Sequence, residues 1–387
     1  MFRGRSLVHV FSVADSLIFV SDQVRRLREL GMAVTLVTSP DERLVRAGLD
    51  LGVRTVGVPM ARRVSPLEDW ASLNRLRDLF TSLRPDIVHA HTPKGGLLGM
   101  LAASAAHVPV RLYQMRGLAY VTQRGPLRAL LSTTERVSCQ SATKVVCQSK
   151  SLLETALEDR LVRADRAEVL LEGSNGVDTR RFNRERWRRD GEALRRAWGA
   201  APDDVVFVFV GRLVRDKGVP ELLEAFAAVR REVPSAQLVL VGPLEERDAL
   251  SPDTVAHLDG SGVRSLGFKP DPAPYLAAAD VLVLPSHREG FPNVPLEAAA
   301  MGLPVVSTTV PGCRDAVERD VTGLLVPPAD AQALAQAMLG YAKSAELRRK
   351  HGAAGLARVE AKFRREVVTE AVMGLYVREM ARVGLTG

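Results

Sequence analysis

The sequence has few cysteines, few aromatic residues and no long apolar run. Its three cysteines, Cys139, Cys147 and Cys313, are too few for a disulfide framework and form no C-x-x-C motif or Cys/His cluster. No stretch reaches the roughly 18 to 20 apolar residues that a membrane-spanning helix needs. Only 5% of the residues are aromatic, so stacking platforms for nucleic acid are scarce. We therefore expect a cytoplasmic, non-exported protein with no nucleic-acid partner and no obligate protein partner.

Acidic residues are scarce in one part of the chain. The net charge is +8, and residues 1–180 carry 25 basic against 18 acidic residues, so the excess lies mainly in the first half. Between residues 87 and 153, Glu135 is the only carboxylate among eight cations. A field of one sign attracts anions. An anionic membrane, a diphosphate-bearing substrate and nucleic acid are the possible partners, and a solvated arginine-rich surface is the alternative.

Short apolar runs alternate with longer amphipathic segments, and this pattern occurs twice. Runs rich in Val, Ile and Leu indicate parallel strands that are covered by helices on both faces. The strands expected in the first half are residues 7–13, 34–38, 54–58, 87–91, 110–113, 144–147 and 168–171. Those expected in the second half are residues 205–210, 237–241, 263–266, 281–284, 305–308 and 324–326. The pattern predicts an α/β fold with two Rossmann-like parallel-sheet domains.

A length of 387 residues is too great for one compact core and favours two domains. We predict a first domain over residues 1–180, a linker over 181–200 and a second domain over 201–364. A C-terminal helix over 365–387 is expected to pack back on the first domain. A ligand is expected in a cleft where the carboxyl ends of the two sets of strands face each other. No G-x-G-x-x-G follows any strand, which speaks against a nicotinamide or flavin cofactor.

One loop of the second half carries two cations. Gly211 and Arg212 directly follow the strand at 205–210, and Lys217 comes five residues after Arg212. An arginine offers a forked contact to phosphate and a lysine offers a point charge. The spacing therefore suits a diphosphate, although the pattern alone is weak.

A second loop carries two carboxylates beside an anion-binding helix start. After the strand at 281–284, Asn293 is a candidate N-cap, and the amides at such a helix start bind phosphate. Glu289 and Glu297 stand eight positions apart around it. Carboxylates suit the hydroxyls of sugar rings better than phosphate. Alternatively, either glutamate caps a helix or pairs with an arginine.

Taken together, these motifs resemble the retaining GT-B glycosyltransferases of family GT4, over nearly the whole chain. The resemblance rests on Gly211-Arg212-Leu213, Lys217-Gly218, Glu289-Gly290-Phe291-Pro292 through Glu297, His89-Ala90-His91, Gly173-Ser174-Asn175-Gly176-Val177-Asp178 and Pro311-Gly312-Cys313-Arg314-Asp315-Ala316-Val317. Within the family, the motifs His91-Thr92-Pro93-Lys94-Gly95 and Arg116-Gly117 are similar to those of bacterial enzymes that extend undecaprenyl-diphosphate-linked sugars.

The resemblance implies a role for each matching residue. Arg212 and Lys217 would neutralise the donor diphosphate and take part in catalysis. Glu289 would hold the hydroxyls of the donor sugar, and Glu297 would hold those of the ribose. His91 would face the reacting sugar. The implied donor-binding residues are Arg212, Lys217, Gly267, Phe268, Glu289, Gly290, Phe291, Pro292, Asn293, Val294 and Glu297.

The acceptor side is expected in the first half. The loop at 12–16 lacks the glycine pair with which many members approach the donor phosphates, so we assign it to the acceptor. The acceptor-binding residues are predicted to be Ser12, Asp15, Lys94, Arg116, Arg124 and Arg128. A helix after Pro126 would rest its cations and nearby apolar side chains on lipid headgroups. Those apolar side chains are Leu118, Tyr120, Leu127, Leu130 and Leu131. We expect a peripheral protein on the inner face of the cytoplasmic membrane.

The expected reaction needs no metal and no cofactor. No D-x-D occurs in the sequence, and Arg212, Lys217 and the helix start near Asn293 can stabilise the leaving diphosphate. His89 and His91 also form an H-x-H pair, but no third metal ligand lies near them in the sequence.

The function that the resemblance implies is retaining transfer of a sugar from a nucleotide diphosphate sugar, expected to be UDP-linked, to a hydroxyl of a lipid-diphosphate-linked sugar. Such a reaction serves bacterial polysaccharide or glycan assembly. Transfer to a soluble small-molecule acceptor, a nucleotide-sugar 2-epimerase and a non-catalytic membrane-bound scaffold are the alternatives.

Overall fold

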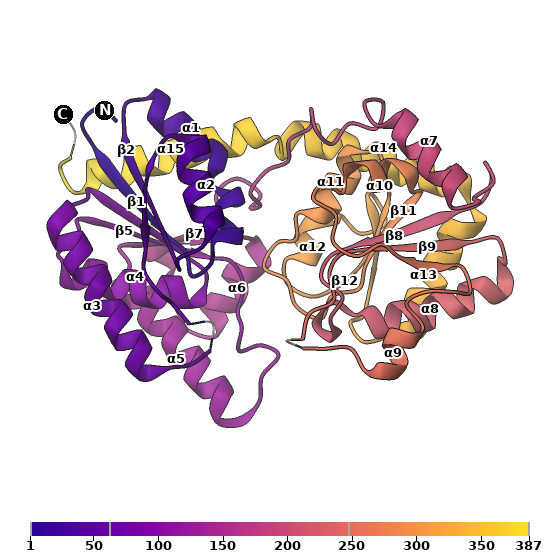
Figure 1. Ribbon diagram of the computed structural model, residues 1–387, viewed down its shortest axis with the longest axis horizontal. Helices are drawn as coiled ribbons and strands as arrows, with labels where there is room; N and C mark the ends of the chain where they lie inside the picture. Colours follow the sequence, from indigo (N-terminus) through magenta and orange to yellow (C-terminus); the bar gives the residue numbers. More distant parts are fainter. Residues whose placement is uncertain (1, 62, 247, 386–387) are drawn as a thin grey trace. The chain divides into compact units, whose positions relative to one another are not determined.

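The computed structural model describes residues 2–61, 63–246 and 248–385, which form two compact units (Figure 1). The first unit runs to Asn175 and resumes at Glu366, and the second is Gly176–Arg365. The chain is therefore an α/β protein with two parallel sheets, as its sequence predicts.

The expected linker, residues 181–200, lies inside the second unit and includes helix α7 (Arg188–Ala197). A Cβ atom on Gly191 would lie 2.9 Å from the backbone of Ala277, so α7 packs closely on α10 (Ala273–Ala278). Arg195 donates to Asp280 at 2.8 Å and to the carbonyl oxygen of Ala278 at 3.1 Å. The arginines that give this segment the composition of a solvated linker thus join it to its domain.

The first unit is built on a seven-stranded parallel sheet of order β3-β2-β1-β4-β5-β6-β7. Its strands are β1 (Ser6–Val10), β2 (Ala33–Thr38), β3 (Arg54–Gly57), β4 (Ile87–His91), β5 (Val110–Met115), β6 (Lys144–Cys147) and β7 (Ala167–Glu168). Each expected strand is present. The predicted β1 and β7 extend too far because apolar residues continue beyond the last hydrogen-bonded pair.

Helices cover both faces of this sheet. They are α1 (Ser21–Glu29), α2 (Glu42–Leu51), α3 (Pro66–Leu83), α4 (Pro93–Ala105), α5 (Gly125–Ser141), α6 (Lys150–Glu158) and α15 (Arg365–Arg382), with 3-10 turns at η1 (Ala14–Phe19) and η2 (Ala164–Arg166). The C-terminal helix α15, yellow in Figure 1, buries Val372, Leu375 and Tyr376 in the same core as Leu7 of β1 and Val24 of α1.

The second unit is built on a six-stranded parallel sheet of order β10-β9-β8-β11-β12-β13. Its strands are β8 (Val206–Val210), β9 (Gln237–Val241), β10 (Val263–Ser265), β11 (Val281–Leu284), β12 (Val305–Thr308) and β13 (Gly323–Val326). Its remaining helices are α8 (Val219–Glu232), α9 (Pro252–Ala256), α11 (Val294–Ala300), α12 (Cys313–Ala316), α13 (Ala331–Lys343) and α14 (Ala345–Lys362), with a 3-10 turn at η3 (Arg215–Lys217). Apolar clusters lie on both faces of the sheet.

Both sheets reverse their strand order at one point. In the first unit β1 lies between β2 and β4, and in the second β8 lies between β9 and β11. Ligands of such sheets bind outside the carboxyl ends of the strands at this switch point. The loops after β1 and β4, and those after β8 and β11, are therefore the positions at which this topology favours a ligand site. Within the described part of the chain, no helix combines the length and apolar character needed to cross a bilayer.

Candidate active site

Glycines let the loops at the switch point of the second sheet pack directly on one another. Gly218 has a φ of +71°, and a Cβ there would lie 2.1 Å from the carbonyl oxygen of Pro285, which follows β11. Gly312 has a φ of +80°, and a Cβ there would lie 2.4 Å from the carbonyl oxygen of Gly290. Only glycine fits such positions. The loops that follow β8, β11 and β12 therefore form one packed group.

Lys217 and Glu289 meet within this group of loops. The Lys217 ammonium donates to Oε1 of Glu289, and the Ser286 hydroxyl donates to the same oxygen at 2.8 Å. Only 17% of the lysine side chain and 13% of the glutamate side chain are exposed, so water screens the pair weakly. The structure thus brings together one expected diphosphate ligand and one expected sugar ligand.

Arg212 pairs with a different residue. Its guanidinium donates to Glu245 at 2.8 Å, in the loop that follows β9, and 45% of its side chain is exposed. Glu245 could not be singled out from local patterns, because the two loops become neighbours only when β8 pairs with β9. A ligand that uses Arg212 must therefore compete with Glu245.

Cys313 stands at the start of α12, near enough to Lys217 and Glu289 for both charges to act on its thiol. Burial, and then the nearby Glu289 carboxylate, raise the pKa of its thiol to about 12. A thiol with a raised pKa is a poor nucleophile. Buried at this position, Cys313 has a packing role.

Glu297 stands in the first turn of α11. Burial raises the pKa of its carboxyl to about 7, against the opposing effect of the guanidinium groups of Arg181 and Arg365. A pKa shift of this kind is typical of carboxyl groups in binding sites. Glu297 therefore changes its charge near neutral pH.

Asn293 occupies the N-cap position of α11 but does not cap the helix as expected. Its backbone has helical angles, φ −77° and ψ −31°, so its side chain does not reach the free amides of the first turn. Its Oδ1 atom is buried and has no hydrogen-bond partner among the described residues. The capping prediction is wrong, and the amide side chain is left available to a ligand.

The other predicted donor residues divide into backbone and side-chain positions. Phe291 is buried with its ring centroid 5.8 Å from that of Phe363, so its side chain belongs to the core. Gly267 has a φ of +65° and accepts a hydrogen bond from the Gly242 amide at 3.0 Å. Phe268 beside it is 69% exposed. Pro292 is buried, and Val294 is half-buried at the start of α11.

At the switch point of the first sheet, the backbone is strained where β4 ends. Thr92 has a φ of 67°, which is rare for a β-branched residue. Its hydroxyl lies 3.2 Å from the hydroxyl of Ser12, which follows β1. A Cβ on Gly95 would lie 3.2 Å from the amide nitrogen of Ser12, so α4 also starts close against this loop. Strain of this kind persists mainly at functional positions.

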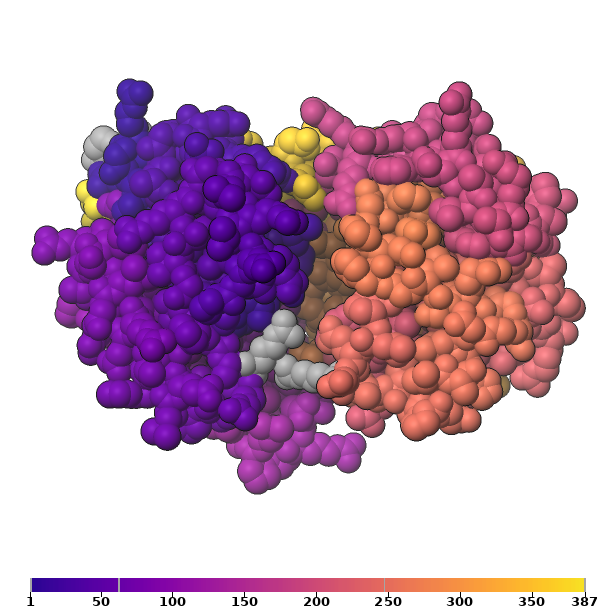
Figure 2. Space-filling view, in the orientation of Figure 1, coloured from indigo at the N-terminus to yellow at the C-terminus, as the bar shows by residue number. Residues whose placement is uncertain are grey.

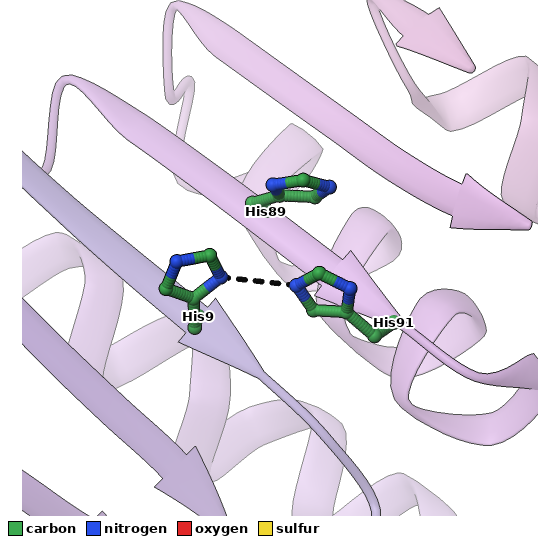
Figure 3. Close-up of side chains that lie close together, drawn as sticks. All are labelled: His9, His89 and His91. Atoms are coloured by element: carbon green, nitrogen blue, oxygen red, sulfur yellow. Dashed lines mark hydrogen bonds between the residues drawn. The ribbon is translucent and has the colours of Figure 1, made fainter. Parts of the chain in front are cut away.

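Three buried histidines converge beside this turn. His9 of β1 is in register with His89 of β4, and all three imidazoles, with His91, lie on the same side of the sheet (Figure 3). Nδ1 of His9 and Nε2 of His91 share a hydrogen bond of 3.0 Å, and Nδ1 of His89 lies 2.8 Å from the hydroxyl of Tyr376. Burial lowers the pKa of each ring, that of His9 to about 3, so all three are neutral near pH 7.

His9 is the site residue that sequence reasoning missed. The absence of a third ligand near His89 and His91 counted against a metal site, yet His9 supplies a third imidazole 80 residues upstream of His89. A single histidine inside an apolar strand was the available signal. Its meaning depends on the pairing of β1 with β4, which no local pattern reveals.

Arg116 follows β5 and is largely buried beside the histidines. It donates to the side chain of Asn175 at 2.8 Å, its Nη2 lies 3.4 Å from Nδ1 of His91, and its guanidinium lies 4.8 Å from the centre of the Phe19 ring. Burial lowers its pKa to about 9. Across the described chain no carboxylate forms an ion pair with it. A buried cation without a counter-ion is expensive, and an anionic ligand would supply one.

Two other predicted acceptor residues are already paired. The Lys94 ammonium lies 2.7 and 2.9 Å from the two oxygens of Asp69, because α3 and α4 pack together. Asp15 forms an ion pair with Arg43. Lys94 thus differs from the free cation that the sequence suggested.

The start of α5 carries exposed cations and apolar side chains. Arg124 is its N-cap, Arg128 lies in its first turn, and both are exposed, as are Leu127 and Leu130. This stretch lies at the lower edge of the first unit in Figure 2.

Two apolar residues expected beside this stretch are not on the surface. Leu118 and Tyr120 are buried in the core, and Leu131 is half-buried. The Tyr120 hydroxyl donates to Asp159, which explains why this aromatic residue turns inward. The prediction that Leu118 and Tyr120 face lipid is wrong.

The chain is similar to known glycosyltransferases in both of its units. The family model described as "Glycosyl transferase 4-like domain" matches residues 18–173, and that described as "Glycosyl transferases group 1" matches residues 204–344. Together they cover the greater part of both units. The chain belongs to the GT4 family of glycosyltransferases and is an enzyme of the hexosyltransferase type.

Two similar relatives are bacterial glycosyltransferases. The chain is 30% identical over 377 residues to the capsular polysaccharide biosynthesis glycosyltransferase CapM of Staphylococcus aureus, covering 97% of each chain. It is 29% identical over 296 residues to the UDP-Gal:alpha-D-GlcNAc-diphosphoundecaprenol alpha-1,3-galactosyltransferase of Escherichia coli, covering 75% of each.

Solved structures confirm the GT-B architecture. Anabaena HepE in complex with UDP has a TM-score of 0.79 at 19% identity, over 96% of this chain and 99% of that one. Sucrose-phosphate synthase from Thermosynechococcus elongatus has a TM-score of 0.80 at 22% identity, over 98% and 100%. At these identities the likeness concerns the fold.

Proposed function

We propose that the enzyme transfers a sugar from a UDP-linked donor to a hydroxyl of a lipid-diphosphate-linked sugar in bacterial polysaccharide assembly. The observation that carries this proposal is the Lys217–Glu289 pair at the switch point of the second sheet. A cation for a leaving diphosphate and a carboxylate for sugar hydroxyls are the two groups that such a donor needs side by side. HepE and its UDP complex, which share the fold, support the choice of UDP.

Donor binding would rearrange existing pairs. A diphosphate that binds Lys217 takes over the role that Glu289 has in the free protein, and the freed carboxylate can accept hydrogen bonds from the sugar. Arg212 would exchange Glu245 for phosphate in the same way. Glu297 would accept hydrogen bonds from the ribose, and the unpartnered oxygen of Asn293 offers a further acceptor.

The acceptor would bind in the first unit, with its diphosphate on Arg116. The support is a largely buried guanidinium that contacts the side chains of Asn175 and His91 and the Phe19 ring, all of them uncharged at neutral pH. The galactosyltransferase of E. coli, whose name specifies a diphosphoundecaprenol acceptor, supports a lipid carrier. Arg124 and Arg128, with Leu127 and Leu130, would hold the protein on the anionic membrane that contains this carrier.

The transfer is proposed to retain the configuration at the anomeric carbon, as the family resemblance implies. The acceptor oxygen forms a bond to that carbon on the face from which the diphosphate leaves, while the carbon–oxygen bond to phosphate breaks. A phosphate oxygen of the donor takes the proton of the acceptor hydroxyl. Lys217 and Arg212 stabilise the charge that grows on the diphosphate, and we infer that no metal is needed.

A product analysis tests this proposal. The enzyme would be incubated with UDP-sugars and either a GlcNAc-diphosphoundecaprenol analogue or soluble sugars as acceptors. We expect one added hexose on the lipid-linked acceptor, with proton NMR showing the anomeric configuration of the donor. Transfer to soluble sugars alone would contradict the proposed lipid-linked acceptor and indicate a soluble one. A product with inverted anomeric configuration would contradict retention.

A further inference from the structure

The cluster of His9, His89 and His91 has the composition and placement of a metal site. One ring nitrogen of each residue lies within 4.8 Å of those of the other two (Figure 3). We propose that these three imidazoles bind a divalent transition metal of the zinc class and that the bound ion blocks transfer. The second part rests on the proposed function, because it assumes that His91 faces the reacting sugar.

The strand geometry supports convergence on one ion. His89 and His91 are two residues apart on β4 and therefore share a face, and His9 is the register partner of His89 on the neighbouring strand. The bonded nitrogens of His9 and His91 are 3.0 Å apart. Two nitrogens bound to the same tetrahedral zinc ion lie about 3.3 Å apart, so His9 and His91 already have nearly the required spacing.

An unused nitrogen in the cluster provides a second observation. Nε2 of His89 is buried and has no hydrogen-bond partner among the described residues. Such an atom is uncommon in folded proteins, and a ligand that uses its lone pair is a usual explanation. The Tyr376 hydroxyl at Nδ1 of His89 orients the ring so that Nε2 is left free, as outer partners of metal-binding histidines do.

The donor set selects the kind of ion. Three imidazoles without a carboxylate or thiolate favour Zn²⁺, Cu²⁺, Ni²⁺ or Co²⁺ over Mg²⁺, Ca²⁺ or Mn²⁺. A cavity of about 20 Å³ next to His89 and His91 has room for one water molecule as a fourth ligand. The Arg116 guanidinium, 3.4 Å from Nδ1 of His91, opposes the ion and should weaken binding.

The test measures metal binding without substrates. Tag-free, chelator-treated protein would be titrated with Co²⁺, whose visible absorption distinguishes tetrahedral from octahedral coordination, and the bound ion would then be displaced with Zn²⁺. His9→Gln and His89→Gln remove ligands. His351→Gln is a matched control, because His351 is also buried and its Nδ1 lies 2.7 Å from the hydroxyl of Tyr341. Thermal melting would verify that each variant is folded.

We expect one Co²⁺ per chain with tetrahedral bands in the wild type and in His351→Gln, and loss of these bands in both ligand variants. Arg116→Met should bind Co²⁺ at least about tenfold more tightly than the wild type does, because the charge that repels the ion is removed. The metal site would be overturned if the wild type showed no tetrahedral bands. It would also be overturned if His9→Gln and His89→Gln showed bands as strong as those of the wild type.

Activity separates the two parts of the inference. Zn²⁺ at the concentration that saturates the site should abolish at least about nine-tenths of the transfer in the wild type and in His351→Gln, with Mg²⁺ having no such effect. If one Zn²⁺ binds per chain and transfer is not inhibited, the metal site is upheld. The assumption that His91 faces the reacting sugar is then contradicted. Inhibition that persists in His9→Gln would show that Zn²⁺ acts elsewhere and would overturn the blocking role.

Discussion

The two residues at the centre of the account are Lys217 and Glu289, which neutralise each other in the free protein. Either can bind a donor only when their mutual contact is exchanged for contacts with the ligand. Part of the binding energy is therefore used to separate the pair, and substitutions of the two residues should be non-additive.

Replacing Lys217 with Ala should weaken binding of UDP by about 1.5 to 3 kcal/mol, because a charged hydrogen bond is lost and the Glu289 carboxylate then repels the phosphates. Lys217→Ala combined with Glu289→Gln should recover part of the affinity. Calorimetric titration of UDP measures both effects. Arg215→Ala is the control, since Arg215 lies in the same loop but is exposed and pairs with Asp248. Equal affinity in the wild type and in Lys217→Ala would contradict the role of this lysine.

Glu297 makes donor binding sensitive to pH. Its carboxyl has a pKa of about 7, and the deprotonated form accepts hydrogen bonds from ribose more strongly. The KM for the donor should therefore rise as the pH falls through 7. Glu297→Gln should have a higher KM that is constant over this range, with kcat less affected. A KM for the wild-type enzyme that does not change with pH would show that Glu297 does not bind the donor.

Among the elements, helix α5 has two features of opposite kind. Its exposed start carries Arg124 and Arg128, and its later turns bury Glu135, which accepts a hydrogen bond from the Tyr113 hydroxyl of β5. The first feature concerns binding at a surface, and the second concerns stability. They can be tested separately because different turns of the helix are involved.

The buried end of α5 should make stability depend on pH. Burial raises the pKa of Glu135 from 4.5 to about 7, so the folded protein binds more protons than the unfolded chain between these values. The contribution of Glu135 to the free energy of unfolding should therefore fall as the pH rises from about 4.5 to 7, by on the order of 3 kcal/mol. The difference in this free energy between the wild type and Glu135→Gln should change by that amount over the range, whereas the difference between the wild type and Glu158→Gln, on the exposed face of α6, should stay constant. Denaturant unfolding measures it, and parallel pH profiles for the wild type and Glu135→Gln would contradict the prediction.

The exposed end of α5 should bind anionic membranes. Each cation near such a surface contributes about 1 kcal/mol, and the contribution is screened by salt. Sedimentation with anionic liposomes should show binding at low salt that is lost at high salt and in the double variant Arg124→Glu/Arg128→Glu. Arg75→Glu/Arg77→Glu on α3 changes the net charge equally and serves as the control. Two results would reject α5 as the membrane-binding element. One is liposome binding that does not depend on the salt concentration, and the other is an equal loss of binding in both double variants.

At the scale of the whole molecule, most of the fold could be predicted from the sequence, because fully buried parallel strands consist of short runs of apolar residues. β4, β6, β9, β11 and β12 have the predicted bounds. Partnerships between distant segments could not be predicted. His9 joins His89 only through the pairing of β1 with β4, and Arg212 meets Glu245 only through the pairing of β8 with β9.

The same limit explains the errors at the site. Lys94 appeared free because Asp69, which neutralises it, lies on another helix. Tyr120 appeared suited to lipid because Asp159, its hydrogen-bond partner, is 39 residues away. Local motifs identify charged and polar residues that could bind a ligand. The tertiary fold determines which of these side chains already have a partner within the protein.

The measurement that tests the central claim most directly is release of UDP by the wild-type enzyme, with and without a lipid-diphosphate-linked sugar, in the presence of a chelator. Transfer without a metal predicts release that depends on the acceptor, is unaffected by the chelator and equals the amount of sugar that reaches the lipid. Release that is independent of the acceptor, or that returns only when a divalent ion is added, would contradict the account.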